Sequence, residues 1–313
     1  KINDIIGDAK TIGIAGHLRP DGDCMGSCMS LYNYLKKNRP DLDVRVFLEF
    51  VDKKFNIIEN TDQIITTGYD GTKFDLFISL DTASLDRLGL NLPFYENAKR
   101  TACIDHHASN DGYADYNYIL PKASSASEVL YDLLDEDLID KSIAEPMYMG
   151  IAHDSGVFRF QSTTPKTMRI AANMIEKGVN VNMILEETFF RKTYNQMMVT
   201  AKIQSEAVLA LDGKCIYGYC TSEMMEEYGV TTKDLDAVVA SIRNVDGVEV
   251  AMFLYQLSED SYKVSLRSKN YVDVSKIAVE NGGGGHVRAA GAEIHGELND
   301  IINKLLNRIK QDI

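Results

Sequence analysis

The chain has 313 residues, more than one average domain holds, and its 45% hydrophobic and 25% charged residues are those of an ordinary globular protein, so we expect two domains. No apolar run approaches the roughly 20 residues that span a bilayer, and the five scattered cysteines form no disulfide framework, which predicts a cytoplasmic protein that does not enter a membrane. The formal net charge of −13 argues against a broad basic groove for long nucleic acid, because neutralising many phosphates needs clustered Lys and Arg, but it permits a small anionic substrate where metal ions reverse the local field.

In the first half of the chain, short apolar runs alternate with helical patterns. We predict strands over 11–16, 44–50, 74–80 and 101–104, and helices over 25–37, 126–134 and 143–152. Between the first strand and the first helix, Pro20 fixes φ and Gly22 permits a tight bend. This alternation predicts an α/β fold built on a doubly wound, mostly parallel sheet.

The pattern changes near residue 212. Residues 165–210 are rich in helix formers, and we expect a connecting helix over about 194–211. Beyond it we predict a strand over 215–220, a helix over 233–242, an antiparallel strand pair over 248–255 and 262–266, a helix over 274–280, a short strand at 292–294 and a terminal helix from Leu298. We therefore divide the chain into a first domain (1–188), a connecting helix (189–211) and a smaller α/β second domain (212–313).

Several of these predicted strands and helices end in acidic residues and histidines. The strand at 101–104 stops on Asp105-His106-His107, and the strand at 74–80 stops on Asp81. Because open α/β sheets gather their functional residues at the carboxyl ends of the strands, we expect one cluster from distant parts of the chain. Its members are His17, Asp21, Asp23, Asp81, Asp105, His106, His107 and Asp154.

Such a cluster of carboxylates predicts bound metal ions. Crowded carboxylates raise one another's pKa unless cations lie among them, and two divalent ions would balance the charges of Asp21, Asp23, Asp81 and Asp154. Oxygen and imidazole ligands without thiolate suit Mn²⁺ better than a structural zinc. Two-metal sites of this kind suit in-line displacement at phosphorus. The alternative interpretation is that these residues are helix caps and turn residues, with His107 a packed histidine.

The order of these motifs also carries a family resemblance. The series H-x-R-P-D-G-D, D-T-A, D-H-H and H-D-S-G, at residues 17–23, 81–83, 105–107 and 153–156, resembles motifs I to IV of the DHH phosphoesterase superfamily. The run G-G-G-G-H at 282–286 resembles the signature of the accessory domain that accompanies many members. Within the superfamily the chain is most similar to the NrnA-type nanoRNases, also described as bifunctional oligoribonuclease and pAp phosphatases.

The resemblance implies a role for each residue of the cluster. One metal ion would be held by His17, Asp21 and Asp81, and the other by Asp23, Asp81, His106 and Asp154, with Asp81 bridging the two. Asp105 would orient an imidazole. His107 would contact the substrate phosphate or the leaving oxygen.

The resemblance also implies substrate contacts, in a cleft between the two domains. Gly284, Gly285 and His286 would contact the nucleotide, and Arg267, followed by Ser268, would clamp a terminal phosphate through a bidentate fork. Arg159 is a further candidate of the same kind. The alternatives are a flexible turn for the glycine run and surface or structural roles for the two arginines. Two other histidines, His153 and His295, we interpret as incidental.

These observations lead to one principal function and several alternatives. We expect a metal-dependent phosphohydrolase that trims very short RNA or DNA oligonucleotides to mononucleotides, with pApA and pAp as related substrates. The alternatives are an inorganic pyrophosphatase or exopolyphosphatase of the same superfamily, and a non-catalytic nucleotide-binding module. A pyrophosphatase would carry a basic S-R-K-K-Q-like signature, of which Ser268-Lys269-Asn270 is at best a fragment. The resemblance is also compatible with a homodimer.

Overall fold

The computed structural model describes residues 1–235 and 238–313, whose contacts group them into two units, Lys1–Arg191 and Lys192–Ile313. Residues 236–237 of the helix predicted over 233–242 lie outside this description. On either side of them are the 3₁₀ helix η6 (Thr232–Asp234) and α10 (Val238–Ile242). None of the helices in the described ranges is long and apolar enough to cross a membrane.

A parallel sheet forms the centre of the first unit, as predicted. Its strand order is β3-β2-β1-β4-β5-β6, and every neighbouring pair runs parallel. The strands are β1 (Thr11–Ala15), β2 (Asp43–Phe47), β3 (Ile64–Ile65), β4 (Leu76–Leu80), β5 (Thr101–Asp105) and β6 (Tyr116–Ile119). The order reverses between β1 and β4, and open sheets of this kind place ligands beyond the carboxyl ends of the strands at such a reversal.

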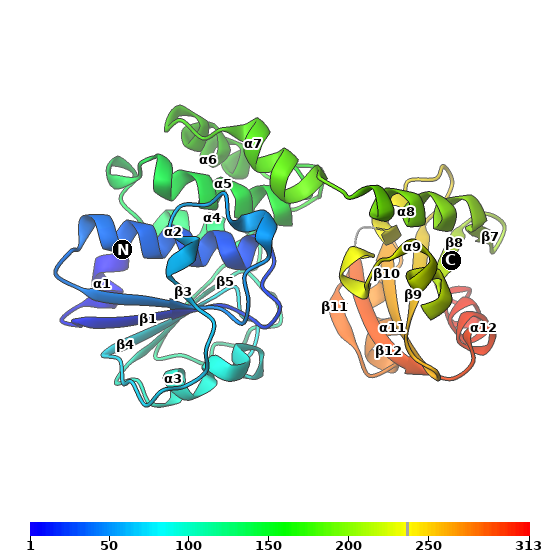
Figure 1. Ribbon diagram of the computed structural model, residues 1–313, viewed down its shortest axis with the longest axis horizontal. Coiled ribbons are helices and arrows are strands. Elements are labelled where there is room, and N and C mark those ends of the chain that lie inside the picture. Colours follow the sequence, from blue (N-terminus) through cyan, green and yellow to red (C-terminus); the bar gives the residue numbers. More distant parts are fainter. Residues whose placement is uncertain (236–237) are drawn as a thin grey trace. The chain divides into compact units, whose positions relative to one another are not determined.

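Helices cover both faces of this sheet, so the prediction of a doubly wound fold is confirmed. Figure 1 shows α2, α4 and α5 on one face and α3 on the other. The helices are α1 (Ile2–Ile6), α2 (Gly22–Asn38), α3 (Leu92–Glu96), α4 (Ala126–Leu133), α5 (Lys141–Asp154), α6 (Pro165–Glu176) and α7 (Val181–Leu185). Shorter turns are the 3₁₀ helices η1 (Lys53–Phe55), η2 (Thr61–Gln63), η3 (Leu85–Asn91) and η4 (Glu136–Leu138) and the π-helix η5 (Glu186–Phe190).

Successive residues of the central strands point to opposite faces of the sheet, and both faces are buried, so each face has its own core. Ile12 and Ile14 of β1 belong to the larger core under α2, α4 and α5. The opposite face buries an aromatic cluster in which the rings of Phe47 and Phe94 lie 4.4 Å apart. Because both faces of the strands are buried, their sequences are almost entirely apolar, as parallel sheets require.

The second unit contains a mixed sheet with the order β11-β12-β10-β9-β8-β7, in which β8 and β9 pair in parallel and the other neighbours antiparallel. One face packs on α11 and α12, and part of the other packs under α8, α9 and α10. The elements not yet given are α8 (Tyr194–Glu206), β7 (Val208–Ala210), β8 (Cys215–Cys220), α9 (Ser222–Tyr228), β9 (Val250–Ser258), β10 (Ser261–Ser268), α11 (Val274–Glu280), β11 (Gly284–His286), β12 (Ala289–His295) and α12 (Leu298–Ile309).

Two local expectations were wrong, and the alternative of a flexible turn for the glycine run does not hold. The helix expected over 194–211 ends at Glu206, because Val208–Ala210 pairs with β8 as an edge strand. Gly22 does not form a bend but is the first residue of α2, and the left-handed residue of that turn is Arg19, with φ 54°. The glycine run is not only a loop, since Gly284–His286 pairs with β12 as an edge strand.

Candidate metal centre

The predicted cluster forms at the reversal of strand order in the first unit. His17 follows β1, Asp81 follows β4, and Asp105 ends β5 with His106 and His107 directly after it. Helix ends supply the other members. Asp21 and Asp23 lie at the start of α2, and Asp154 is the last residue of α5.

His17 and Asp21 each present one atom to the cluster and use the other for local structure. The Nδ1 atom of His17 lies 2.7 Å from the carbonyl oxygen of Leu18, to which it donates. This leaves Nε2 facing the carboxylates, 3.5 Å from Asp81 and 3.7 Å from Asp21. Asp21 caps α2 because its Oδ1 accepts the backbone N–H groups of Asp23 and Cys24, and its Oδ2 is the atom that faces His17. The His17 ring, held in this orientation by Leu18, would be a preorganised ligand if a metal ion were bound here.

A second group of ligand atoms surrounds His106. Its Nε2 lies 3.1 Å from Asp154, 3.4 Å from Asp81 and 4.0 Å from Asp23. Asp23 is fully buried and accepts the backbone N–H groups of Ala126 at 2.5 Å and Ser127 at 3.0 Å. Those donors belong to the first turn of α4, whose N-terminus favours a negative charge. These donors favour the ionised form of Asp23, and a cation beside it would favour that form further.

Asp81 lies between these two groups and provides the test of whether the residues suit a metal ion. Its side chain is buried, and its Oδ1 accepts no hydrogen bond within the described ranges. The same atom lies 3.4 Å from His106 and 3.7 Å from His107. Since a buried carboxylate oxygen without a donor is costly, the donor set fits a cation. The left-handed backbone of Asp81, at φ 52°, is strain of the kind found at functional sites.

The charges of the cluster shift the pKa values of its members in different directions. Burial acts to raise the pKa of Asp81, but the neighbouring His106 and His17 rings hold it below its ordinary value. Burial raises the pKa of Asp23, and the neighbouring Asp81 and Asp154 raise it further. Burial alone would lower the pKa of His106, but Asp154 and Asp81 raise that pKa well above its ordinary value. Protons thus offset the excess negative charge where no metal ion does so, and metal ions would have to displace them.

Asp105 and His107 form a separate pair at the edge of the cluster. Asp105 is fully buried and accepts a hydrogen bond of 2.8 Å from Nδ1 of His107. Its other oxygen accepts 2.7 Å from the amide of Asn110, which also donates to the carbonyl oxygen of Thr82. Asp105 is therefore placed to orient the His107 ring.

Three residues that support the cluster were missed by sequence reasoning. Asn110 carried no signal, because a polar residue in a loop is common. A Cβ added at Gly150 would lie 2.7 Å from Oδ1 of Asp23, so α5 can approach that carboxylate only with glycine there. His153, interpreted as incidental, is packed: its ring lies against Gly22, and its Nε2 lies 2.9 Å from the hydroxyl of Thr188. Spacing along the chain reveals none of these contacts.

The predicted substrate residues divide between the two units. Arg159 follows α5, and its Nε donates to the carbonyl oxygen of Gly156 at 2.9 Å. In the second unit, Arg267 pairs across strands with Ala289, which in turn pairs with His286. Directly opposed residues point to the same face of a sheet, so Arg267 and His286 share one face.

Ser268 and the two predicted glycines differ in whether they lie on the same face of the sheet as Arg267 and His286. Ser268 points to the opposite face from Arg267, where it is buried and donates to the carbonyl oxygen of Val272 at 2.7 Å. The structure therefore does not bring Ser268 to the other candidates. Gly284 lies on the face of His286, and Gly285 has the left-handed φ of 140° that glycine tolerates.

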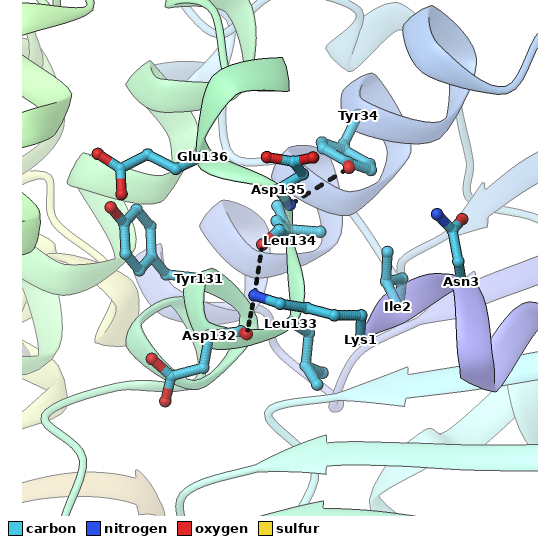
Figure 2. A pocket seen from close by; sticks show the side chains of 10 residues that line it. All are labelled: Lys1, Ile2, Asn3, Tyr34, Tyr131, Asp132, Leu133, Leu134, Asp135 and Glu136. Atoms are coloured by element: carbon cyan, nitrogen blue, oxygen red, sulfur yellow. Dashed lines mark hydrogen bonds between the residues drawn. The ribbon is translucent and has the colours of Figure 1, made fainter.

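A cavity of about 480 Å³ lies elsewhere in the first unit, beside the first residues of the chain. Figure 2 shows the Lys1 ammonium donating to the carbonyl oxygens of Asp132 and Leu134, at 3.0 and 3.2 Å. Tyr34 and Tyr131 also line it. None of the described lining residues belongs to the metal cluster, so this cavity is not the candidate site.

Comparison with known proteins was made for sequence and for structure. The DHH family, N-terminal domain, matches residues 11–151, and the DHHA1 domain matches residues 212–312. A bifunctional oligoribonuclease and PAP phosphatase NrnA of Thermus thermophilus is 31% identical over 96% of this chain and 90% of that protein. The protein of the same description from Bacillus subtilis is 27% identical over 91% and 90%. The crystal structure of an exopolyphosphatase-related protein from Bacteroides fragilis superposes with a TM-score of 0.90 at 23% identity, covering 99% of this chain and 95% of that one.

Proposed function

Because this chain belongs to the DHH family and its second unit matches the DHHA1 domain, we propose that it hydrolyses phosphate esters of short nucleotides. Its substrates are RNA or DNA oligonucleotides of a few residues and dinucleotides such as pApA, which it cleaves to mononucleotides, and pAp, from which it removes the 3′-phosphate. Relatives described as oligoribonuclease and PAP phosphatase support this substrate class.

The observation that carries the proposal is the buried Oδ1 of Asp81, which accepts no hydrogen bond from the described residues and lies 3.4 Å from His106 and 3.7 Å from His107. We assign His17, Asp21 and Asp81 to one divalent ion and Asp23, Asp81, His106 and Asp154 to the other. Mn²⁺ is the proposed metal, because the ligands are oxygen and imidazole atoms. When bound, such a pair of ions supplies an activated water and offsets the charge that develops at phosphorus.

His107 is the proposed proton donor to the leaving oxygen. Its hydrogen bond to Asp105 places a proton on Nδ1, since a carboxylate only accepts. Nε2 is then the ring nitrogen that would give a proton to the leaving oxygen as the ester bond breaks. Asn110 holds Asp105 in place from its other side.

Substrate binding is proposed for residues of both units. Arg267 and His286, with Gly284 and Gly285, would hold the nucleotide in the second unit, and Arg159 would contact phosphate in the first. We propose on this basis that residues 1–188 form the catalytic domain and residues 212–313 the substrate-binding domain, joined by residues 189–211. The cytoplasmic location and the homodimer remain predictions.

The test is Mn²⁺-dependent release of mononucleotides from fluorescent RNA oligomers of two to five residues, beside pAp, pApA and pyrophosphate. The wild-type chain should cleave the nucleotides and lose activity in chelator. Asp81→Ala should abolish turnover, whereas His286→Ala should mainly raise KM. Preferential cleavage of pyrophosphate would overturn the nucleotide assignment, and undiminished Mn²⁺-dependent turnover by Asp81→Ala would overturn the metal assignment.

A further inference from the structure

The open face of the sheet in the second unit extends beyond the predicted nucleotide contacts. Along β10, Val264 and Leu266 point into the core with α11 and α12, so Lys263, Ser265 and Arg267 point to the opposite face. On that face the helices α8 to α10 pack mainly over β8 and β9, where Ala251 and Phe253 are buried, and α10 also contacts β10. The part over β10, β12 and β11 is therefore at least partly exposed to solvent.

The floor of this open part is made of small residues. Ser265 of β10 lies opposite Gly291 of β12, and Gly291 lies opposite Gly284 of β11. In the next row, Ala289 lies between Arg267 and His286. The result is a shallow floor of serine, glycine and alanine with a cation at one end, over which a flat or extended ligand can lie close to the backbone.

Lys263 stands at the other end of this floor. It lies directly opposite Glu293 in the strand register, yet within the described ranges the structure records no ion pair between them. Its side chain instead runs toward Arg267: a Cβ added at Gly291 would lie 3.7 Å from Cε of Lys263. Gly291 is opposite Ser265, two residues closer to Arg267 along β10. Cε of Lys263 thus lies near the Ser265 row, which is separated from the Arg267 row by about 7 Å, the rise of two strand residues.

We infer that Lys263 binds a second backbone phosphate, next to the one assigned to Arg267. The open face of this sheet would then bind two successive phosphates of one oligonucleotide. This inference rests on the proposed function and makes it narrower. A 5′-phosphorylated oligonucleotide of three or more residues has at least one phosphate besides the scissile and the terminal phosphate, and Lys263 can bind that additional phosphate. The bisphosphate pAp has none.

The test compares Lys263→Met, which keeps the aliphatic stem and removes the charge, with wild type on pAp and on 5′-phosphorylated RNA of two, three and five residues. KM should rise about five- to tenfold for the trimer and pentamer, as for the loss of one charge-assisted contact. KM for pAp and the dimer should change less than about twofold, within ordinary context effects. Lys263→Arg should restore the wild-type length preference.

Two further comparisons decide the interpretation. Lys276→Met removes an exposed cation of α11 in the same unit and should leave every KM unchanged. Equal KM changes for all substrates with Lys263→Met, or no change for the trimer, would overturn the inference.

If the wild-type chain cleaves none of these nucleotides, the proposed function fails, and trimer binding then tests Lys263 by itself. In an Asp81→Asn background, loss of Lys263 should lower the slope of log Kd against log salt by about 0.7, and an unchanged slope would refute the contact.

Discussion

Gly22 lies between the carboxylates of Asp21 and Asp23, and its missing side chain sets how those ligands approach α5. A Cβ added there would lie 2.1 Å from Cγ of the His153 ring. That ring cannot move away easily, because its Nε2 contacts Thr188 and its faces meet Phe55 and Phe189. Any side chain at position 22 must therefore push the start of α2 away from Asp154.

We predict that Gly22→Ala weakens Mn²⁺ binding by at least about tenfold, the size of effect expected when the support of metal ligands is disturbed. Isothermal titration of the variant with Mn²⁺ measures this directly. Adding His153→Ala should recover part of the affinity, because it removes the ring that the new methyl group strikes, and such coupling is diagnostic of contacting residues. Additive losses in the double variant would show that the contact is not the cause.

At the scale of single elements, the turn between β10 and α11 depends on one buried carboxylate. Glu249, just before β9, accepts the backbone N–H groups of Asn270, Tyr271 and Val272 at distances of 2.8 to 3.1 Å. Burial acts to raise the pKa of Glu249, but these hydrogen bonds outweigh it and lower that pKa below its ordinary value. The turn begins three residues after Arg267, at Asn270, so Glu249 fixes the end of the strand that carries the proposed phosphate contact.

We predict that Glu249→Gln destabilises the second unit by about 1–3 kcal/mol at pH 7, the cost of leaving buried donors poorly satisfied. Because the folded-state pKa is depressed, the ionised form stabilises the fold above the unfolded-state pKa, and this contribution is lost as the pH falls through the folded-state value. Amide hydrogen exchange at residues 270–272 should therefore differ between wild type and variant at pH 7 and converge under acid conditions. Exposed Glu259→Gln is the matched control, and a gap that widens in acid would contradict the assignment.

The individual strands and helices show which parts of the fold and of the cluster could be predicted from the sequence. The strands that carry His17, Asp81 and Asp105 are apolar runs buried on both faces, and their carboxyl ends must meet in a parallel sheet, so the cluster followed from the pattern. The strands β3 and β6 were missed because one has two residues and the other, beginning at Tyr116, is largely exposed. The contacts of Asn110 and Gly150 depend on how elements pack, which periodicity does not encode.

For the whole molecule, the two units differ in what a metal ion can stabilise. All the proposed ligands, from His17 to Asp154, belong to the unit Lys1–Arg191, and the second unit has cores of its own. A ligand stabilises only the structure that must form to bind it. Metal binding should therefore act on the unfolding of the first unit and leave that of the second unchanged.

We predict that Mn²⁺ at about 100 times its Kd raises the free energy of unfolding of the first unit by about 2.7 kcal/mol. Hydrogen exchange followed by mass spectrometry should show slower exchange in β1, β4 and α5 on adding Mn²⁺, with no change in β9 and β10. Asp81→Asn should abolish the effect, because it removes the carboxylate shared by both proposed ions, while Asp75→Asn at the other end of β4, where Asp75 pairs with Lys99, should retain it. Protection that spread equally through both units would mean that metal binding is coupled to the fold of the second unit, and an effect that persisted in Asp81→Asn would place the ions elsewhere.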